Sequence, residues 1–423
     1  MADTFTTEGG VPIPTELATD LRTVCFGSAA APPTRPEWTK TSFIFGTPNE
    51  GNPYGLRCPR NACRGLIAVV QGFLVKNFLF DRRARSSLST PEESTKNGKE
   101  AISKLTSSAF TPKTNRCIDF GMSEILKQIA EKEPIMVVLP GEEIFVAHSV
   151  TFFHDSITEK LYVFQMQRPD DVQFFLQRHI SHFSNLIHTL YVLPVYRRRR
   201  PRMYVVAIQC CPDKDHIKTD LDNSLQYLTG TFEEGSLNVV TLLLTGRATP
   251  HLHNGVIHVG DEDNYALPQY GILNRCSVGL LIYENEKRVD QQKQPGSRLK
   301  TPNLPIWISS CMGYFGVLFN TNGDLLRNYH AESRFELYYY SLSGTQVSMT
   351  IDNSTYHDQA AGMLLRAPSG SEGFSTSRRN SDVDDKDESN SSPLQKLVHT
   401  KWQESVVKFH DDPQVMSTLF CPF

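Results

Sequence analysis

Two cysteines, Cys58 and Cys63, lie in a short loop before an apolar segment and have the clearest potential for chemistry. The segment that follows, RGLIAVVQGFLVKNFLF, has apolar residues three and four positions apart on more than one face, which predicts a buried central helix. A loop that delivers a thiol to a helix N-terminus is a common way to build a cysteine nucleophile. The helix dipole and the backbone N–H groups of the first turn lower the thiol pKa and hold an oxyanion. The stretch Cys58–Phe80 therefore directs attention to thiol chemistry at the start of this helix.

Other common catalytic and cofactor motifs are missing from the sequence. It has no GxxxxGK[ST], GxGxxG or HExxH pattern, and no serine lies in a GxSxG elbow. A zinc site needs four ligands, usually in tight pairs, and Cys58 and Cys63 have no CxxC partner pair. The other candidate ligands are scattered along the chain: Cys210, Cys211, His251, His253 and His258. We therefore expect no metal and no cofactor, and structural or incidental cysteines are the simpler explanation.

Composition limits the class of protein. The chain has 423 residues, enough for one large domain or two ordinary ones, and its net charge of −3 gives no general attraction to nucleic acid or to a membrane. Its nine cysteines are odd in number and scattered, which favours a reducing compartment. Neither a signal peptide nor an apolar run of the roughly 18–20 residues needed to span a bilayer is visible. We expect a soluble cytoplasmic protein, with the basic run at 196–203 as a nuclear import signal, a phosphate-binding patch or ordinary solvated charge.

The order of the expected elements indicates an α+β fold. Helices are expected first, at 122–131 with Ser123 as N-cap, at 169–186, and at 238–245 with Gly246 as its stop. Strands are expected at 135–139 and 161–166, and a run of β-branched and aromatic segments follows at 305–309, 314–319, 335–340 and 347–351. Helices followed by an antiparallel sheet favour an α+β domain over a doubly wound parallel one.

Composition also predicts the domain boundaries. Residues 1–35 are rich in Pro, Thr, Ala and Gly and are expected to be flexible. Residues 36–367 form the main domain, and the low-complexity stretch 368–393 is expected to be a disordered insert within it. Residues 394–423 complete the domain, with an edge strand expected within 397–407.

Several blocks, in order along the chain, resemble the MINDY family of cysteine deubiquitinases, most of all its fourth branch and the inactive paralogue of that branch. The most specific are LKTP running into LPIW at 299–307, RFELYYY at 334–340 and HTKW at 399–402. The other matching blocks are PEW, SFIF and YG between 36 and 55, AVVQG at 68–72, LLLTG at 242–246 and YFGVLF at 314–319. The resemblance covers roughly residues 36–410 with gaps.

This resemblance implies a papain-like cysteine-protease fold of the MINDY kind, with helices around an antiparallel sheet. It also implies cleavage of isopeptide bonds in lysine-48-linked ubiquitin chains. The family uses a cysteine nucleophile, a histidine base and an upstream glutamine in the oxyanion hole. The thiol must lose its proton to the imidazole, and the amide must donate to the developing oxyanion.

All three chemical positions of the family pattern are substituted in this chain. Gly65 and the following LIAVVQG set the register, which places the nucleophile position on Arg64 and the oxyanion position on Cys58. The Ser-His-Phe of the family falls on Gly313-Tyr314-Phe315, so Tyr314 holds the position of the base. Tyrosine has an unperturbed pKa near 10 and is a poor proton acceptor at neutral pH. Arg64 also places a cation at the positive end of a helix, unless an acid or a bound carboxylate compensates.

Cys63 is the fallback nucleophile, one residue before the expected position. On a helix that offset is about 100° of rotation and about 1.5 Å of rise, and a misplacement of about 1 Å can already cost roughly a hundredfold in rate. We therefore predict an inactive MINDY-type deubiquitinase that binds ubiquitin or lysine-48-linked chains. The alternatives are an active isopeptidase that uses Cys63 and a protein that has also lost ubiquitin binding.

Overall fold

The computed structural model describes residues 9–26, 44–45, 54–58, 64–81, 112–130, 135–140, 161–166, 168, 170–176, 220, 228, 237–260, 267–284, 294–354, 391–412 and 419. Its helices are α1 (Thr15–Phe26), α3 (Arg64–Phe80), α6 (Pro112–Ala130), α10 (Leu237–Thr245), α11 (Ser297–Lys300), α12 (Tyr329–Ser333) and α14 (Pro393–His399), with a helical segment at 170–176. Its strands are β1 (Val11–Pro12), β2 (Ile44–Phe45), β3 (Leu56–Arg57), β4 (Ile135–Pro140), β5 (Leu161–Met166), β6 (Val256–Val259), β7 (Leu267–Tyr270), β8 (Gly279–Tyr283), β9 (Ile306–Cys311), β10 (Tyr314–Phe319), β11 (Arg334–Ser341), β12 (Gln346–Asp352) and β13 (Val406–Phe409).

A six-stranded sheet forms the C-terminal part, in the order β13-β12-β11-β10-β9-β8. Its strands pair antiparallel except β8, which runs parallel to β9. The expected strands from 305 to 351 are thus confirmed. The edge strand is β13, which lies at 406–409, whereas most of the expected range 397–407 is helix α14 and the turn after it. Helices and a mostly antiparallel sheet confirm the α+β class.

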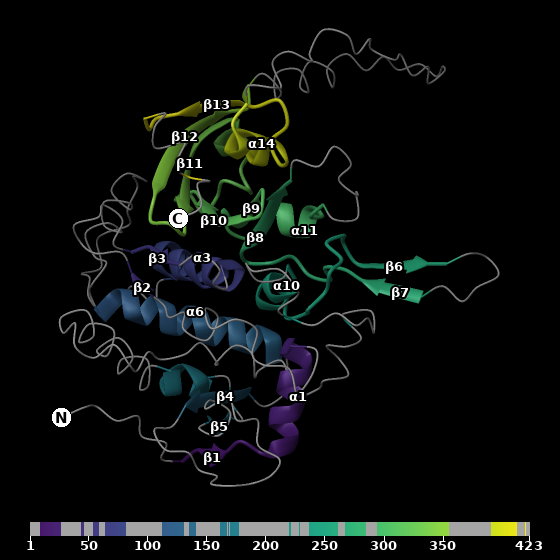
Figure 1. Ribbon diagram of the computed structural model, residues 1–423. Helices are drawn as coiled ribbons and strands as arrows, with labels where there is room; N and C mark the ends of the chain where they lie inside the picture. The colour runs from purple at the N-terminus through teal and green to yellow at the C-terminus, as the bar shows by residue number, and fades with distance from the viewer. Residues whose placement is uncertain are drawn as a thin grey trace.

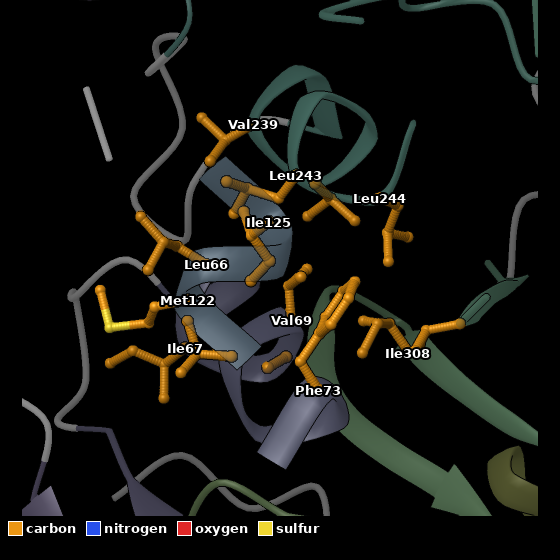
Figure 2. Packing of buried hydrophobic residues seen from close by; sticks show 14 of the residues in the cluster. Leu66, Ile67, Val69, Phe73, Met122, Ile125, Val239, Leu243, Leu244 and Ile308 are labelled. Carbon is orange, nitrogen blue, oxygen red and sulfur yellow. The ribbon is translucent and has the colours of Figure 1, made fainter. Parts of the chain in front are cut away.

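The central helix α3 separates this sheet from the rest of the molecule. It packs on β9 and β10, while α6 and α10 cover its other side, and the sheet β1-β5-β4 lies beyond α6 (Figure 1). Fourteen of the 17 residues of α3 are buried, which confirms the central buried helix predicted from the apolar spacing. Figure 2 shows the resulting core, in which side chains of α3, α6, α10 and β9 meet.

Close packing at α3 depends on Gly72. A Cβ atom at this position would lie 2.7 Å from Cδ1 of Ile308 on β9. The helix backbone can therefore approach the sheet only because this residue has no side chain. The other face of the sheet carries a separate core cluster, which includes Trp307, Leu397 and Trp402, so both faces of the sheet are covered.

Three expectations about element boundaries were wrong. The region expected to be flexible contains α1, because Ala18 and Val24 are buried in the main core and the N–H of Leu228 donates to the carbonyl of Val24. Helix α6 begins ten residues earlier than expected, and Ser123 lies inside it, where its hydroxyl donates to the carbonyl of Phe120 rather than capping the helix.

The third error concerns the end of the insert. Helix α14 already begins at Pro393, and the Ser392 side chain caps it by accepting from the N–H of Gln395. The remainder of the insert, the basic run at 196–203 and the part of the expected helix after 176 lie outside the described residues. Within the described part of the chain, no helix combines the length and hydropathy needed to cross a membrane.

Candidate functional site

Arg64 and Tyr314 meet where the N-terminus of α3 approaches the start of β10. Arg64 is the first residue of α3 and is only 6% exposed, although it is a charged side chain. Its Cζ atom lies 5.9 Å from the centroid of the Tyr314 ring, which is within the range of a cation–π contact. Two residues 250 positions apart, each singled out by the sequence, are therefore in contact.

The hairpin between β9 and β10 positions Tyr314. Its two-residue loop is Met312-Gly313, and both residues have positive φ values, 52° and 82°. Such loops match the right-handed twist of the flanking strands. Cys311 and Tyr314 are partners directly across this loop, so the phenol lies at the very start of β10.

Gly65 positions Arg64 from the helix side. A Cβ atom at Gly65 would lie 2.8 Å from Cγ2 of Val240 on α10 and 3.3 Å from Cζ of Phe315 on β10. The absence of a side chain at this residue lets the first turn of α3 fit between α10 and the sheet. Gly65 thus holds Arg64 beside the strand that carries Tyr314.

Cys58 lies at the same end of the large sheet. Its N–H donates to the carbonyl of Leu342 (3.0 Å), the residue that follows β11. Gly316 of β10 is the register partner of Ser341, so Tyr314 and Leu342 both lie at this end of the two antiparallel strands. The other predicted residue, Cys63, lies outside the described residues.

The buried amide of Gln71 on α3 holds the segment that carries Cys58. Its Oε1 accepts from the N–H of Leu56 (2.8 Å), and the Tyr340 hydroxyl donates to the carbonyl of Leu56 (3.2 Å). Strand β3 is therefore fixed to the central helix and to β11 at once, and Cys58 follows directly after it.

Sequence reasoning missed Tyr339, which lies beside this site. A Cβ atom at Gly316 would lie 2.5 Å from the Tyr339 hydroxyl, so the ring fills the space that this glycine leaves open. Burial raises the pKa of Tyr339, and the positive charge of Arg64 lowers it in part. The phenol stays protonated at neutral pH and cannot serve as a base there. The spacing of the adjacent tyrosines 338–340 indicates only a strand, so it could not predict that Tyr339 fills the space at Gly316.

Two of the described thiols, those of Cys276 and Cys311, are poorly suited to act as nucleophiles. Burial raises the pKa of both Cys276 and Cys311 to about 12, against an ordinary value of 9.0. At neutral pH the thiolate fraction is then lower by roughly a thousandfold, and thiolate is the reactive form. The Cys311 sulfur instead donates to the carbonyl of Pro393 (3.4 Å). These two thiols are structural.

Two of the histidines considered as metal ligands lie close to each other. The rings of His251 and His253 lie 5.7 Å apart, near the base of the β6–β7 hairpin rather than at α3. Across the described ranges, no group of three or more His, Cys, Asp or Glu side chains is arranged to hold a metal ion.

A comparison with protein families identifies the domain. The family described as "Deubiquitinating enzyme MINDY-3/4, conserved domain" matches residues 22–411. The chain belongs to the MINDY-3/4 family. The match begins inside α1 and ends just after β13, so it includes the large sheet, α3 and both residues of the Arg64–Tyr314 contact.

Individual relatives agree with this assignment. "Probable ubiquitin carboxyl-terminal hydrolase MINDY-4" of Xenopus tropicalis is 24% identical over 412 residues, which cover 96% of this chain and 47% of that protein. The human protein of the same name is 25% identical over 347 residues, 81% of this chain and 42% of its own length. A MINDY-3 homolog of Drosophila melanogaster is 22% identical over 209 residues, 49% of this chain and 34% of that protein. The chain thus spans less than half the length of these relatives. No solved structure matches it.

Proposed function

We propose that this chain is an inactive member of the MINDY family that binds ubiquitin chains without cleaving them. The observation that carries the proposal is the contact between Arg64 and Tyr314 at the N-terminus of the central helix. A thiol hydrolase needs a nucleophile and a base in contact at such a place, with the nucleophile at the positive end of a helix. The contact supports the register in which these two residues occupy the nucleophile and base positions of a papain-like fold.

Arg64 cannot attack a carbonyl carbon, and a tyrosine phenol such as that of Tyr314 is a poor general base. A guanidinium group has five N–H donors and no free lone pair for attack on a carbonyl carbon, and it does not lose its proton in proteins. The oxyanion position holds Cys58, whose thiol is a weak hydrogen-bond donor in place of an amide. What this pair can do is stack and donate hydrogen bonds, which are binding interactions.

A titration with lysine-48-linked di-ubiquitin tests the proposal. We expect saturable binding to the full chain, with the di-ubiquitin recovered intact on a gel afterwards, and weaker binding of lysine-63-linked di-ubiquitin, because the family resemblance implies the lysine-48 linkage. Isothermal titration calorimetry reports the binding. No heat with either linkage at concentrations up to about 100 μM would contradict binding. Any remaining interaction would have a Kd above that concentration, which corresponds to a binding free energy weaker than about 5.5 kcal/mol. Cleavage of the di-ubiquitin that disappears in Cys63→Ala would contradict inactivity.

A further inference from the structure

The β6–β7 hairpin carries an exposed apolar strand. All four residues of β6 are exposed, including Val256 (41%), Ile257 (43%) and Val259 (45%). β-branched residues are usually half-buried in strands, and a two-stranded hairpin alone is marginally stable in water. Figure 1 shows the hairpin projecting away from the layers of the domain. Within the described part of the chain, β7 is the only strand that pairs with β6.

The base of this hairpin is fixed to the domain. The N–H of Ile272, two residues after β7, donates to the carbonyl of His253 (2.8 Å), and an Arg298 guanidinium N–H donates to the carbonyl of Ile272 (2.6 Å). Asn254 accepts from the N–H of Arg298 (3.0 Å), and the Arg247 guanidinium stacks over the Tyr270 ring at 5.0 Å. An anchored base presents β6 as a preformed strand, which lowers the entropy cost of binding.

The two strands differ in how they protect their outer edges. β7 contains Pro268, which has no N–H to donate, and proline is one of the usual devices that block edge pairing. β6 has the sequence VIHV and contains no proline, lysine or glycine. Its outer edge therefore offers backbone donors and acceptors to another strand without any of the common protective residues.

Charge indicates what kind of strand would pair there. The sequence has no Lys or Arg between Arg247 and Arg275, and three acidic residues, Asp261, Glu262 and Asp263, follow β6 after Gly260. A basic partner gains from these charges, whereas the β6–β7 hairpin of a second copy brings the same acidic segment and has no Lys or Arg between Arg247 and Arg275. We propose that the outer edge of β6 binds an extended, basic, β-branched segment of another protein by strand addition.

Fluorescence anisotropy with two labelled peptides tests this inference. One peptide alternates valine and lysine, and the other alternates valine and glutamate. We expect the basic peptide to bind at least about tenfold more tightly than the acidic one, a difference of about 1.4 kcal/mol. Equal affinity of the two peptides, or no binding of either, would overturn the proposal.

Matched variants test the location. Val259→Lys adds a protective cation to β6 and should weaken binding of the basic peptide at least about tenfold. Val406→Lys is the control, because Val406 is 49% exposed on β13, at the edge of the large sheet, and the substitution makes the same change in net charge. It should change the affinity by less than about twofold. If Val259→Lys fails to fold, as judged by circular dichroism, Val256→Lys takes its place.

Two further outcomes would reassign the edge. A concentration-dependent dimer that Val259→Lys abolishes in light scattering would identify a second copy as the occupant. Loss of di-ubiquitin binding in Val259→Lys would identify ubiquitin itself. The strand-addition proposal does not rest on the proposed function. Di-ubiquitin binding that survives in Val259→Lys would separate the binding of ubiquitin from the binding of a basic strand at β6.

Discussion

Replacing Phe73 with alanine is expected to lower the free energy of unfolding by about 4 kcal/mol. Phe73 is fully buried in the middle of α3. Figure 2 shows its ring among core side chains that include Val69, Leu244 and Ile308. A Cβ atom at Gly121 of α6 would lie 3.1 Å from the Cβ of Phe73, so α6 crosses α3 at close range here. Removal of the ring would leave a cavity between three helices and the sheet that rigid neighbours cannot fill.

Urea unfolding measures this effect, and the chain provides a matched control. Phe174, in the helical segment 170–176, is 68% exposed, so Phe174→Ala should change stability by less than about 0.5 kcal/mol. A shift of the midpoint by similar amounts in both variants would show that Phe73 does not lie in the main core.

Replacing Trp307 with alanine is expected to lower the free energy of unfolding by about 4 kcal/mol. Trp307 belongs to the core cluster on the face of the large sheet opposite to α3. Trp307 is fully buried on β9, and its indole N–H donates to the carbonyl of Lys300 (2.9 Å). Its ring packs edge-on against Trp402, with centroids 5.4 Å apart, and the ammonium of Lys401 lies over both rings. Two of the blocks that carry the family resemblance, at 299–307 and 399–402, are thus in direct contact.

A graded pair of variants separates packing from hydrogen bonding at this site. Trp307→Phe keeps an aromatic ring but leaves the Lys300 carbonyl without its donor, so it should cost about 1–3 kcal/mol. The expected order of stability in urea is wild type, then Trp307→Phe, then Trp307→Ala. Equal stability of the two variants would contradict a packing role for the ring.

The helices and strands that were predicted correctly are those whose conformation is specified by the sequence of the element itself. The alternation and β-branched content at 314–319 and 347–351 predicted β10 and β12, and the apolar spacing after Arg64 predicted α3. Gly246, with φ of 82°, ends α10 as expected, and its N–H donates to the carbonyl of Leu242. In each case the determining interactions lie within the element or one turn beyond it.

Elements that depend on distant contacts were missed. β8 is a short apolar run whose parallel pairing with β9 has no local signature. Helix α1 has weak periodicity and gains its burial from the main core, and part of the contact comes from Leu228, about 200 residues away. The hairpin of β6 and β7 went unpredicted because its apolar strand is exposed rather than buried.

The candidate site was predictable only in part. Family register placed Arg64 and Tyr314 at paired positions, and the fold brings them into contact. No periodicity could have shown this, because the two residues are separated by the whole of α6, α10 and the first strands of the sheet. Tyr339 was missed because its approach to the site depends on the open space at Gly316.

Reaction with ubiquitin that carries an electrophile at its C-terminus tests the inactive assignment most directly. An active cysteine deubiquitinase forms a covalent adduct with such a probe, which intact-mass spectrometry detects, and a MINDY enzyme with its catalytic cysteine serves as the positive control. The proposed register puts Arg64 and Tyr314 in the positions of nucleophile and base, so this chain is predicted to form no adduct. An adduct at Cys63 that disappears in Cys63→Ala would contradict the account.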